Sequence, residues 1–106
     1  MFTNDARFLV KKAIQEETIN AKKTYGTLYH SFHEGYAVTK EEIEEVEVMV
    51  NGMKHYMADL WESVKADNVD FDKIEFIHNS AFYAAMECLQ VCACCNKMMG
   101  KEEVVE

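Results

Sequence analysis

An apolar seam between residues 43 and 64 is the longest regular pattern in the sequence. Its members follow one another at alternating steps of three and four residues: Ile43, Val46, Val50, Met53, Met57, Leu60 and Val64. This spacing places the side chains along one face of a long α-helix, as in a coiled coil. Such a seam is buried only against other helices, so the sequence predicts an all-α fold built as an antiparallel bundle of long helices.

Two further helices are predicted to flank the one that carries the seam. The first spans Asp5 to about Lys23. Residues typical of helix caps and breaks mark the boundaries: Gly26, Ser31, Asp67 or Asp70, and Gly100. The second turn is short, so the second and third helices are expected to be antiparallel neighbours. Because the chain has no proline and four glycines, it lacks the turn residues of a many-stranded fold. We expect one helical domain over residues 1–100 and a frayed acidic tail over residues 101–106.

The third helix is apolar on nearly all sides between Ala81 and Cys95. A helix with this composition is typically buried on every side, and three helices form too thin a slab to bury it. We therefore expect oligomerisation, as a homodimer or homotetramer, to complete the bundle. Four cysteines lie on this helix: Cys88, Cys92, Cys94 and Cys95. The Cys92–Cys95 spacing occurs in zinc and redox sites, but no further ligands complete such a site. We expect Cys88, Cys92 and Cys95 to pack in the buried seam.

The charge balance excludes several classes of partner. With 11 basic and 19 acidic residues, the net charge is −8, and such a field repels nucleic acid and anionic lipid. The beginning of the chain lacks the basic and then apolar order of a signal peptide, and no disulfide framework is expected. We therefore expect a cytoplasmic protein that binds neither nucleic acid nor membrane.

Glutamates interrupt the apolar pattern at two places. At about 100° per residue, Glu42 and Glu45 share a stripe with apolar neighbours, whereas Glu41 and the other acidic residues of the run do not. On the third helix, Glu87 and Gln90 form a similar pair. Buried carboxylates require a compensating cation, and these strips contain no lysine. The two pairs would form an oxygen cage suited to Mg²⁺ or Mn²⁺.

These residues resemble the signature of the MazG-like all-α nucleoside triphosphate pyrophosphohydrolases, relatives of the dimeric dUTPases and dCTPases. The signature is an E-E-x-x-E helix followed by an E-x-x-D helix, matched here by residues 41–45 and 87–90. The resemblance implies a MazG-like bundle and metal binding by four residues: Glu42, Glu45, Glu87, and Gln90 in the place of the family's aspartate.

The expected function is a metal-dependent hydrolysis of nucleoside triphosphates. The resemblance implies that a nucleoside triphosphate is split into a monophosphate and pyrophosphate with Mg²⁺ or Mn²⁺, and Glu41 is a candidate to orient the attacking water. The alternative is a non-catalytic oligomeric helical assembly or interaction protein that keeps the fold without the activity. Gln90 supports this alternative, because a neutral amide can hydrogen-bond a glutamate without a metal.

The segment before the second helix leaves two interpretations open. His30 and His33 either contact a substrate from one shared face or lie on the surface near the cap. Similarly, the aromatic residues Tyr29, Phe32 and Tyr36 either stack on a base or belong to the core.

Overall fold

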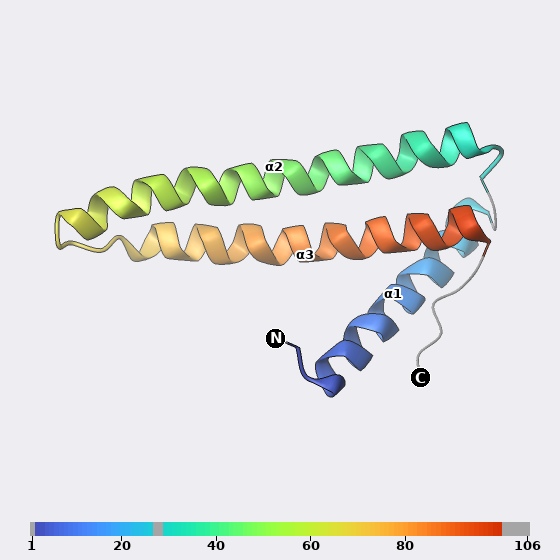
Figure 1. Cartoon of the computed structure of the whole chain (residues 1–106), viewed down its shortest axis with the longest axis horizontal. Helices are drawn as coiled ribbons and strands as arrows, with labels where there is room; N and C mark the ends of the chain where they lie inside the picture. The colour runs from blue at the N-terminus through green and yellow to red at the C-terminus, as the bar shows by residue number, and fades with distance from the viewer. Residues whose placement is uncertain (1, 27–28, 101–106) are drawn as a thin grey trace.

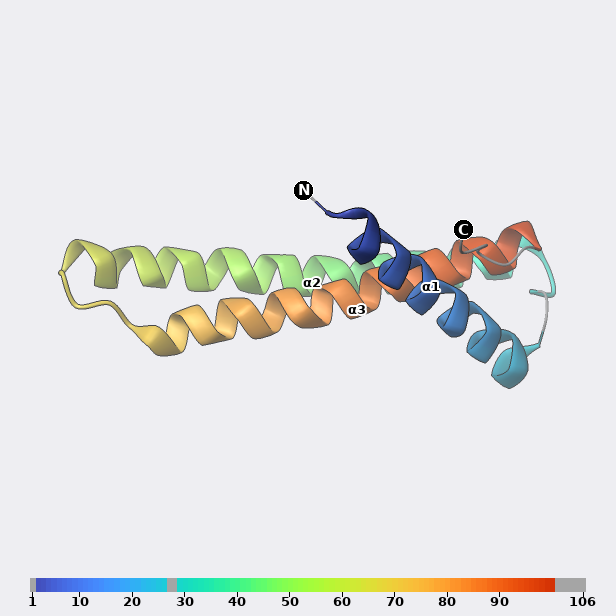
Figure 2. The ribbon, with the colours of Figure 1, turned by 90° about the horizontal axis from the view of Figure 1, so that it is seen from below.

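The protein consists of three helices, arranged as a long hairpin with a third helix packed across one end (Figure 1). The computed structural model describes residues 2–26 and 29–100. The helices are α1 (Asn4–Tyr25), α2 (Phe32–Lys65) and α3 (Phe71–Met99). In both views α2 and α3 run antiparallel, and α1 crosses the C-terminal half of α3 at an angle (Figures 1 and 2). The described residues contain no strand, which confirms the expected all-α fold.

Local capping explains where the helices begin and end. The Ser31 hydroxyl accepts a hydrogen bond of 3.1 Å from the backbone N–H of Glu34, and the Asp70 carboxylate accepts one of 3.0 Å from Asp72. Gly100 ends α3 in the left-handed conformation, with φ at 69°, which costs glycine little. The expected boundaries of the two long helices are therefore confirmed. The tail predicted over residues 101–106 lies outside the described residues.

The strips that carry the glutamates contribute to the contact between α2 and α3, whereas part of the apolar seam stays outside it. Tyr56 stacks on Phe76 with ring centroids 5.0 Å apart. Gly52 lies opposite Ser80, whose hydroxyl is 3.8 Å from the position of an added Cβ. Met57, a seam residue, is 53% exposed. Because each helix of a hairpin buries one stripe against the other, parts of the seam remain at the surface of the single chain.

The predicted burial of the cysteines is wrong for the single chain. Cys88, Cys92 and Cys95 are exposed, and Cys94 is the buried member of the group. On the same helix Phe82 is 56% exposed, so the single chain does not cover all sides of α3, and the expected burial of α3 in an oligomer stays a prediction. The physical reason is that α2 and α1 cover only part of the circumference of α3, and periodicity does not show which part.

A buried hydrogen bond between Thr18 and Asn96 connects α1 to α3. Thr18 is fully buried; its hydroxyl donates to the carbonyl oxygen of Ile14 at 2.8 Å and accepts from the Asn96 amide nitrogen at 3.2 Å. Both polar groups are thus satisfied inside an apolar contact, as burial requires. The Thr18–Asn96 contact positions α1 beside the C-terminal part of α3.

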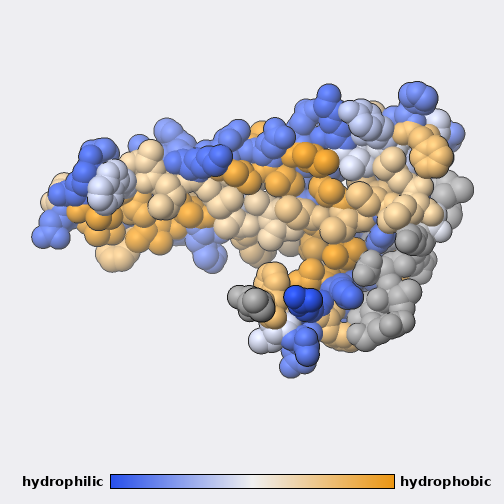
Figure 3. Space-filling model, in the orientation of Figure 1, coloured by the Kyte–Doolittle hydropathy of each residue, from blue (hydrophilic) through white to orange (hydrophobic). Residues whose placement is uncertain are grey.

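The molecule is elongated, measuring 54 × 33 × 20 Å. Its radius of gyration is 17.4 Å, whereas a compact domain of this length has about 13 Å. Apolar side chains consequently spread along the hairpin surface (Figure 3). No helix of the described chain has the length and apolar character needed to cross a membrane.

Gly35 gives a test of the packing at the open end of the hairpin. A Cβ on Gly35 would lie 2.8 Å from Met98 Cγ and 2.9 Å from Tyr29 Cδ2. We therefore expect Gly35→Ala to lower the free energy of unfolding by about 1–3 kcal/mol, the range for overpacking. Chemical denaturation followed by circular dichroism measures the change.

Gly52→Ala is the matched control for that variant. A Cβ on Gly52 would lie 3.8 Å from its nearest neighbour, the hydroxyl oxygen of Ser80. The better helix propensity of alanine should therefore stabilise the protein by up to about 1 kcal/mol. Equal effects of the two substitutions would show that the close approach at Gly35 does not matter for stability.

Candidate functional site

Three carboxylates from two helices meet near the middle of the hairpin. Glu42 and Glu45 extend from α2, and Glu87 extends from α3. One oxygen atom of each lies within 4.8 Å of the others. Their spacing of three residues on α2 places two of the carboxylates on one face, and the antiparallel partner supplies the third. The structure thus brings together three of the four residues expected as metal ligands, and we call them the carboxylate cluster.

The proximity of these groups changes their proton affinity. Burial raises the pKa of Glu42, and the charges of Glu45 and Glu41 raise it further, although a hydrogen bond with Glu87 lowers it. The pKa of Glu45 is raised mainly by its hydrogen bond with Glu87 and by the charge of Glu87. Like charges this close disfavour simultaneous ionisation. The carboxylate cluster is therefore suited to take up positive charge, as a proton or a cation.

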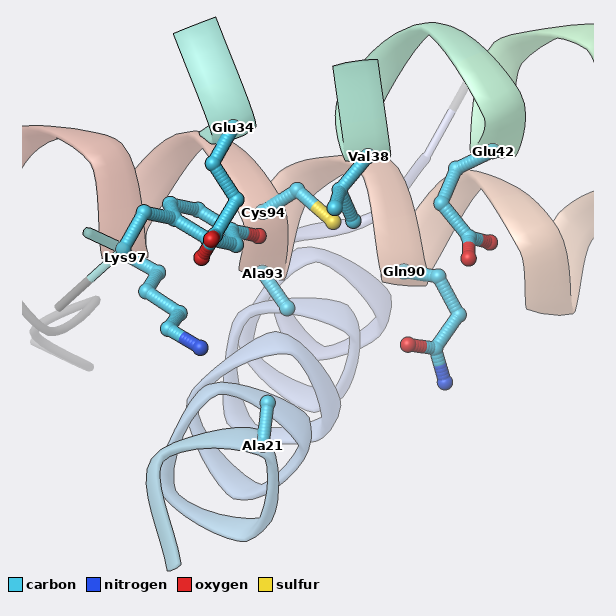
Figure 4. Close-up of a pocket in the computed structure, with 9 residues that line it drawn as sticks. Ala21, Glu34, Val38, Glu42, Gln90, Ala93, Cys94 and Lys97 are labelled. Carbon is cyan, nitrogen blue, oxygen red and sulfur yellow. The ribbon is translucent and has the colours of Figure 1, made fainter. Parts of the chain in front are cut away.

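Gln90 does not join the carboxylate cluster in this structure. Its amide nitrogen donates a hydrogen bond of 2.6 Å to Glu17 of α1, and its side chain points away from Glu42 (Figure 4). In this structure the Gln90 amide connects α3 to α1, and its part in a metal ligand set stays a prediction. The helical wheel of α3 placed Gln90 beside Glu87 correctly, but it contained no information on the position of α1.

Glu41 also lies outside the cluster. Its side chain is exposed on α2, and its influence on the cluster is the charge that raises the pKa of Glu42. This position follows from the turn of 100° per residue, which directs neighbours on a helix to different sides. Among residues 2–26 and 29–100, Glu41 makes no hydrogen bond or ion pair that would assign it a catalytic role.

A groove of about 440 Å³ begins at Glu42 and runs between the three helices (Figure 4). We call it the central groove; it is lined by Ala21, Tyr29, Glu34, Val38, Glu42, Gln90, Ala93, Cys94 and Lys97. Carboxylates therefore share this groove with a lysine, an aromatic ring and several small apolar side chains. A cleft with an apolar lining and a few convergent polar groups is typical of small-molecule sites.

Two uncharged polar side chains, the Tyr29 hydroxyl and the Cys94 thiol, also line the central groove. Burial raises the pKa of Tyr29 far above its usual value, and a hydrogen bond with Cys94 raises it further. Burial likewise raises the pKa of Cys94. Both groups therefore remain protonated at neutral pH, and neither supplies a nucleophilic anion.

Lys97 was missed by the sequence reasoning. It is only 5% exposed, and its ammonium lies 4.3 Å from the centroid of the Tyr29 ring. A lysine in the last turn of a helix usually interacts with the helix dipole at the surface, so its position in the sequence gave no signal of burial. Its proximity to Tyr29 depends on how the segment before α2 packs on α3.

The residues around the start of α2 lie at the surface of the single chain. His30 pairs with Glu34 at 3.1 Å, and its side chain is 93% exposed. Phe32 and Tyr36 are 75% and 66% exposed, so neither belongs to the core of the single chain. His33 is also exposed, and it borders a second groove together with His30 and Phe32.

No protein-family model, curated protein or solved structure matches this chain in the three comparisons made with known proteins. The candidate site is therefore defined by its own geometry: a cluster of three carboxylates at one end of a groove shared by all three helices.

Proposed function

We propose that the protein is a divalent-metal-dependent hydrolase that splits nucleoside triphosphates into monophosphate and pyrophosphate. The observation that supports it is the carboxylate cluster, in which Glu42, Glu45 and Glu87 place oxygen atoms within 4.8 Å of one another. This arrangement agrees with the resemblance to MazG-like enzymes carried by the two acidic motifs. The central groove beside Glu42 offers room for a substrate.

The donor set fits a hard divalent cation. Carboxylate oxygens are the ligands preferred by Mg²⁺ and Mn²⁺. The mutual proximity of Glu42, Glu45 and Glu87 would be stabilised by a cation, because like charges raise the pKa of Glu42 and of Glu45. We propose that these two residues and Glu87 hold the ion, without Gln90. When bound, the ion would neutralise phosphate charge and make an attacking water more acidic.

Glu42 and Glu87 would hold the cation beside the groove in which the substrate binds. Glu42 connects the cluster to the central groove, and Glu87 places a carboxylate oxygen within 4.8 Å of those of both glutamates of α2. The net charge of −8 opposes the approach of a free nucleotide, and a bound cation at the carboxylate cluster would reduce this repulsion. Glu41 remains our candidate to orient the attacking water when a substrate is bound.

Metal-dependent thermal stability tests the proposed site. An ion at about ten times its Kd stabilises the folded state by about 1.4 kcal/mol, which raises Tm by several degrees in a domain of this size. We expect this increase for the wild type in MgCl₂ or MnCl₂ relative to EDTA. Differential scanning fluorimetry measures it.

The variant Glu87→Gln separates the metal site from general salt effects. It should abolish the increase in Tm with Mg²⁺, because it removes the carboxylate that α3 contributes. Glu47→Gln is the matched control, since it removes the same charge from an exposed position of α2 outside the cluster. An equal response of both variants to Mg²⁺, or no nucleotide hydrolysis by the metal-loaded wild type, would contradict the proposal.

The raised pKa of Glu42 predicts a dependence on pH in the absence of metal. A carboxyl whose pKa is higher in the folded than in the unfolded chain destabilises the fold once pH rises through the folded pKa. In EDTA, Glu42→Gln should therefore be more stable than the wild type near pH 7. The difference should disappear near pH 4, below the usual glutamate pKa of about 4.3. Urea denaturation at several pH values measures it, with Glu47→Gln, which removes a carboxylate outside the cluster, as the matched control.

A second candidate function, a non-catalytic self-associating helical protein, is favoured by the open apolar surface. We infer a homodimer or homotetramer because large apolar side chains remain exposed on both long helices, among them Trp61 at 56%, Tyr83 at 57% and Met86 at 49%. The elongated shape leaves no further helix of the described chain to cover them. Large exposed apolar patches are rare in monomeric proteins, so several large exposed apolar side chains on both long helices favour self-association.

Cysteine labelling combined with light scattering tests self-association. Exposed Cys88 and Cys95 should react rapidly with a thiol reagent in dilute protein, whereas buried Cys94 should react slowly. If a second copy covers α3, the labelling of the two exposed thiols slows as protein concentration rises, and the scattering mass exceeds the chain mass of 12.3 kDa. A mass that stays at one chain at micromolar concentrations excludes the oligomer.

A further inference from the structure

Lys97 is buried to a degree that lysines rarely reach. Only 5% of its surface is exposed, and lysines are almost never fully buried without a paired charge. The ion pairs found among the described residues do not include Lys97. Its ammonium instead contacts the face of the Tyr29 ring, 4.3 Å from the ring centroid. A ring face attracts a cation but supplies no negative charge to neutralise it.

The nearest acidic residue of the groove is already engaged elsewhere. Glu34 lines the central groove, but one of its oxygens pairs with the His30 ring at 3.1 Å and the other accepts from the His30 backbone N–H at 3.3 Å. Both oxygens of Glu34 are therefore turned toward His30. The Lys97 ammonium, a donor of three hydrogen bonds, points into the groove (Figure 4).

We propose that Lys97 and the ring of Tyr29 form a binding subsite for an oxyanion of the phosphate type, at the end of the central groove away from the carboxylate cluster. An ammonium in an apolar cleft is stabilised most by an oxyanion that accepts charge-assisted hydrogen bonds. Ala21 and Ala93 line the same groove with apolar surface, and a charge-assisted hydrogen bond is stronger in such surroundings than in bulk water.

The subsite is separate from the carboxylate cluster. Lys97 follows Glu87 by ten residues on α3, which separates their backbone positions by about 15 Å along the axis at about 1.5 Å per residue. A compact oxyanion at Lys97 therefore does not reach the cluster. A molecule that contacts both ends is elongated, with an anionic group at Lys97 and a metal-binding group at Glu42. This subsite goes beyond the proposed function and does not need the metal.

Titration with inorganic phosphate and pyrophosphate in EDTA tests the subsite without the metal. Wild-type protein should bind them, as followed by ³¹P NMR. Lys97→Met, which keeps the length of the side chain and removes its charge, should weaken binding at least tenfold. Lys54→Met is the matched control: it removes one positive charge from an exposed position of α2 and should leave the Kd unchanged.

Two further readouts separate a binding role from a structural one. In the wild type, the phosphate titration should shift the side-chain NMR signals of Lys97 and Tyr29, a measurement that does not require any variant to fold. Phosphate should also raise the Tm of the wild type and of Lys97→Arg, which keeps the charge, but not that of Lys97→Met. Absence of phosphate binding by the wild type, or equal binding by Lys97→Met, would overturn the subsite. Failure of the Mg²⁺ titration alone would contradict only the proposed hydrolase.

Discussion

The packing of α2 against α3 is the interaction on which the rest of the structure depends. Tyr56 and Phe76 stack in this contact, and the same contact brings Glu87 toward the two glutamates of α2. Like charges oppose this approach, so the apolar part of the contact must outweigh their repulsion. The carboxylate cluster is therefore held by its neighbours on the two helices, and it exists only while the hairpin is closed.

Much of the fold could be predicted from local signals in the sequence. Ser31, Asp70 and Gly100 cap helices as expected because capping depends on residues within one turn. The meeting of Glu42, Glu45 and Glu87 was also predictable, since their spacing puts them on facing strips of antiparallel helices. These features need only the geometry of a single helix and of its nearest neighbour along the chain.

The features that could not be predicted depend on which helix covers which face. Gln90 bonds to Glu17, 73 residues away in the sequence, and no pattern within α3 indicates such a partner. The burial of Lys97 has the same origin, because it depends on the segment around Tyr29. Cys88 differs from Lys97 in the opposite direction: the apolar pattern of α3 predicts that it is buried, but it is exposed because no helix covers that face of α3 in the single chain.

The separation of contacts along the chain favours a particular order of assembly. The hairpin is closed by a short connection between α2 and α3, so its contacts can form stepwise from the turn with little loss of chain entropy. The contact of Thr18 with Asn96 joins residues 78 positions apart, which makes the docking of α1 the entropically more expensive step. Since Ala21 of α1 lines the central groove, the topology favours a folding route in which the carboxylates meet first and the groove beside them is completed last.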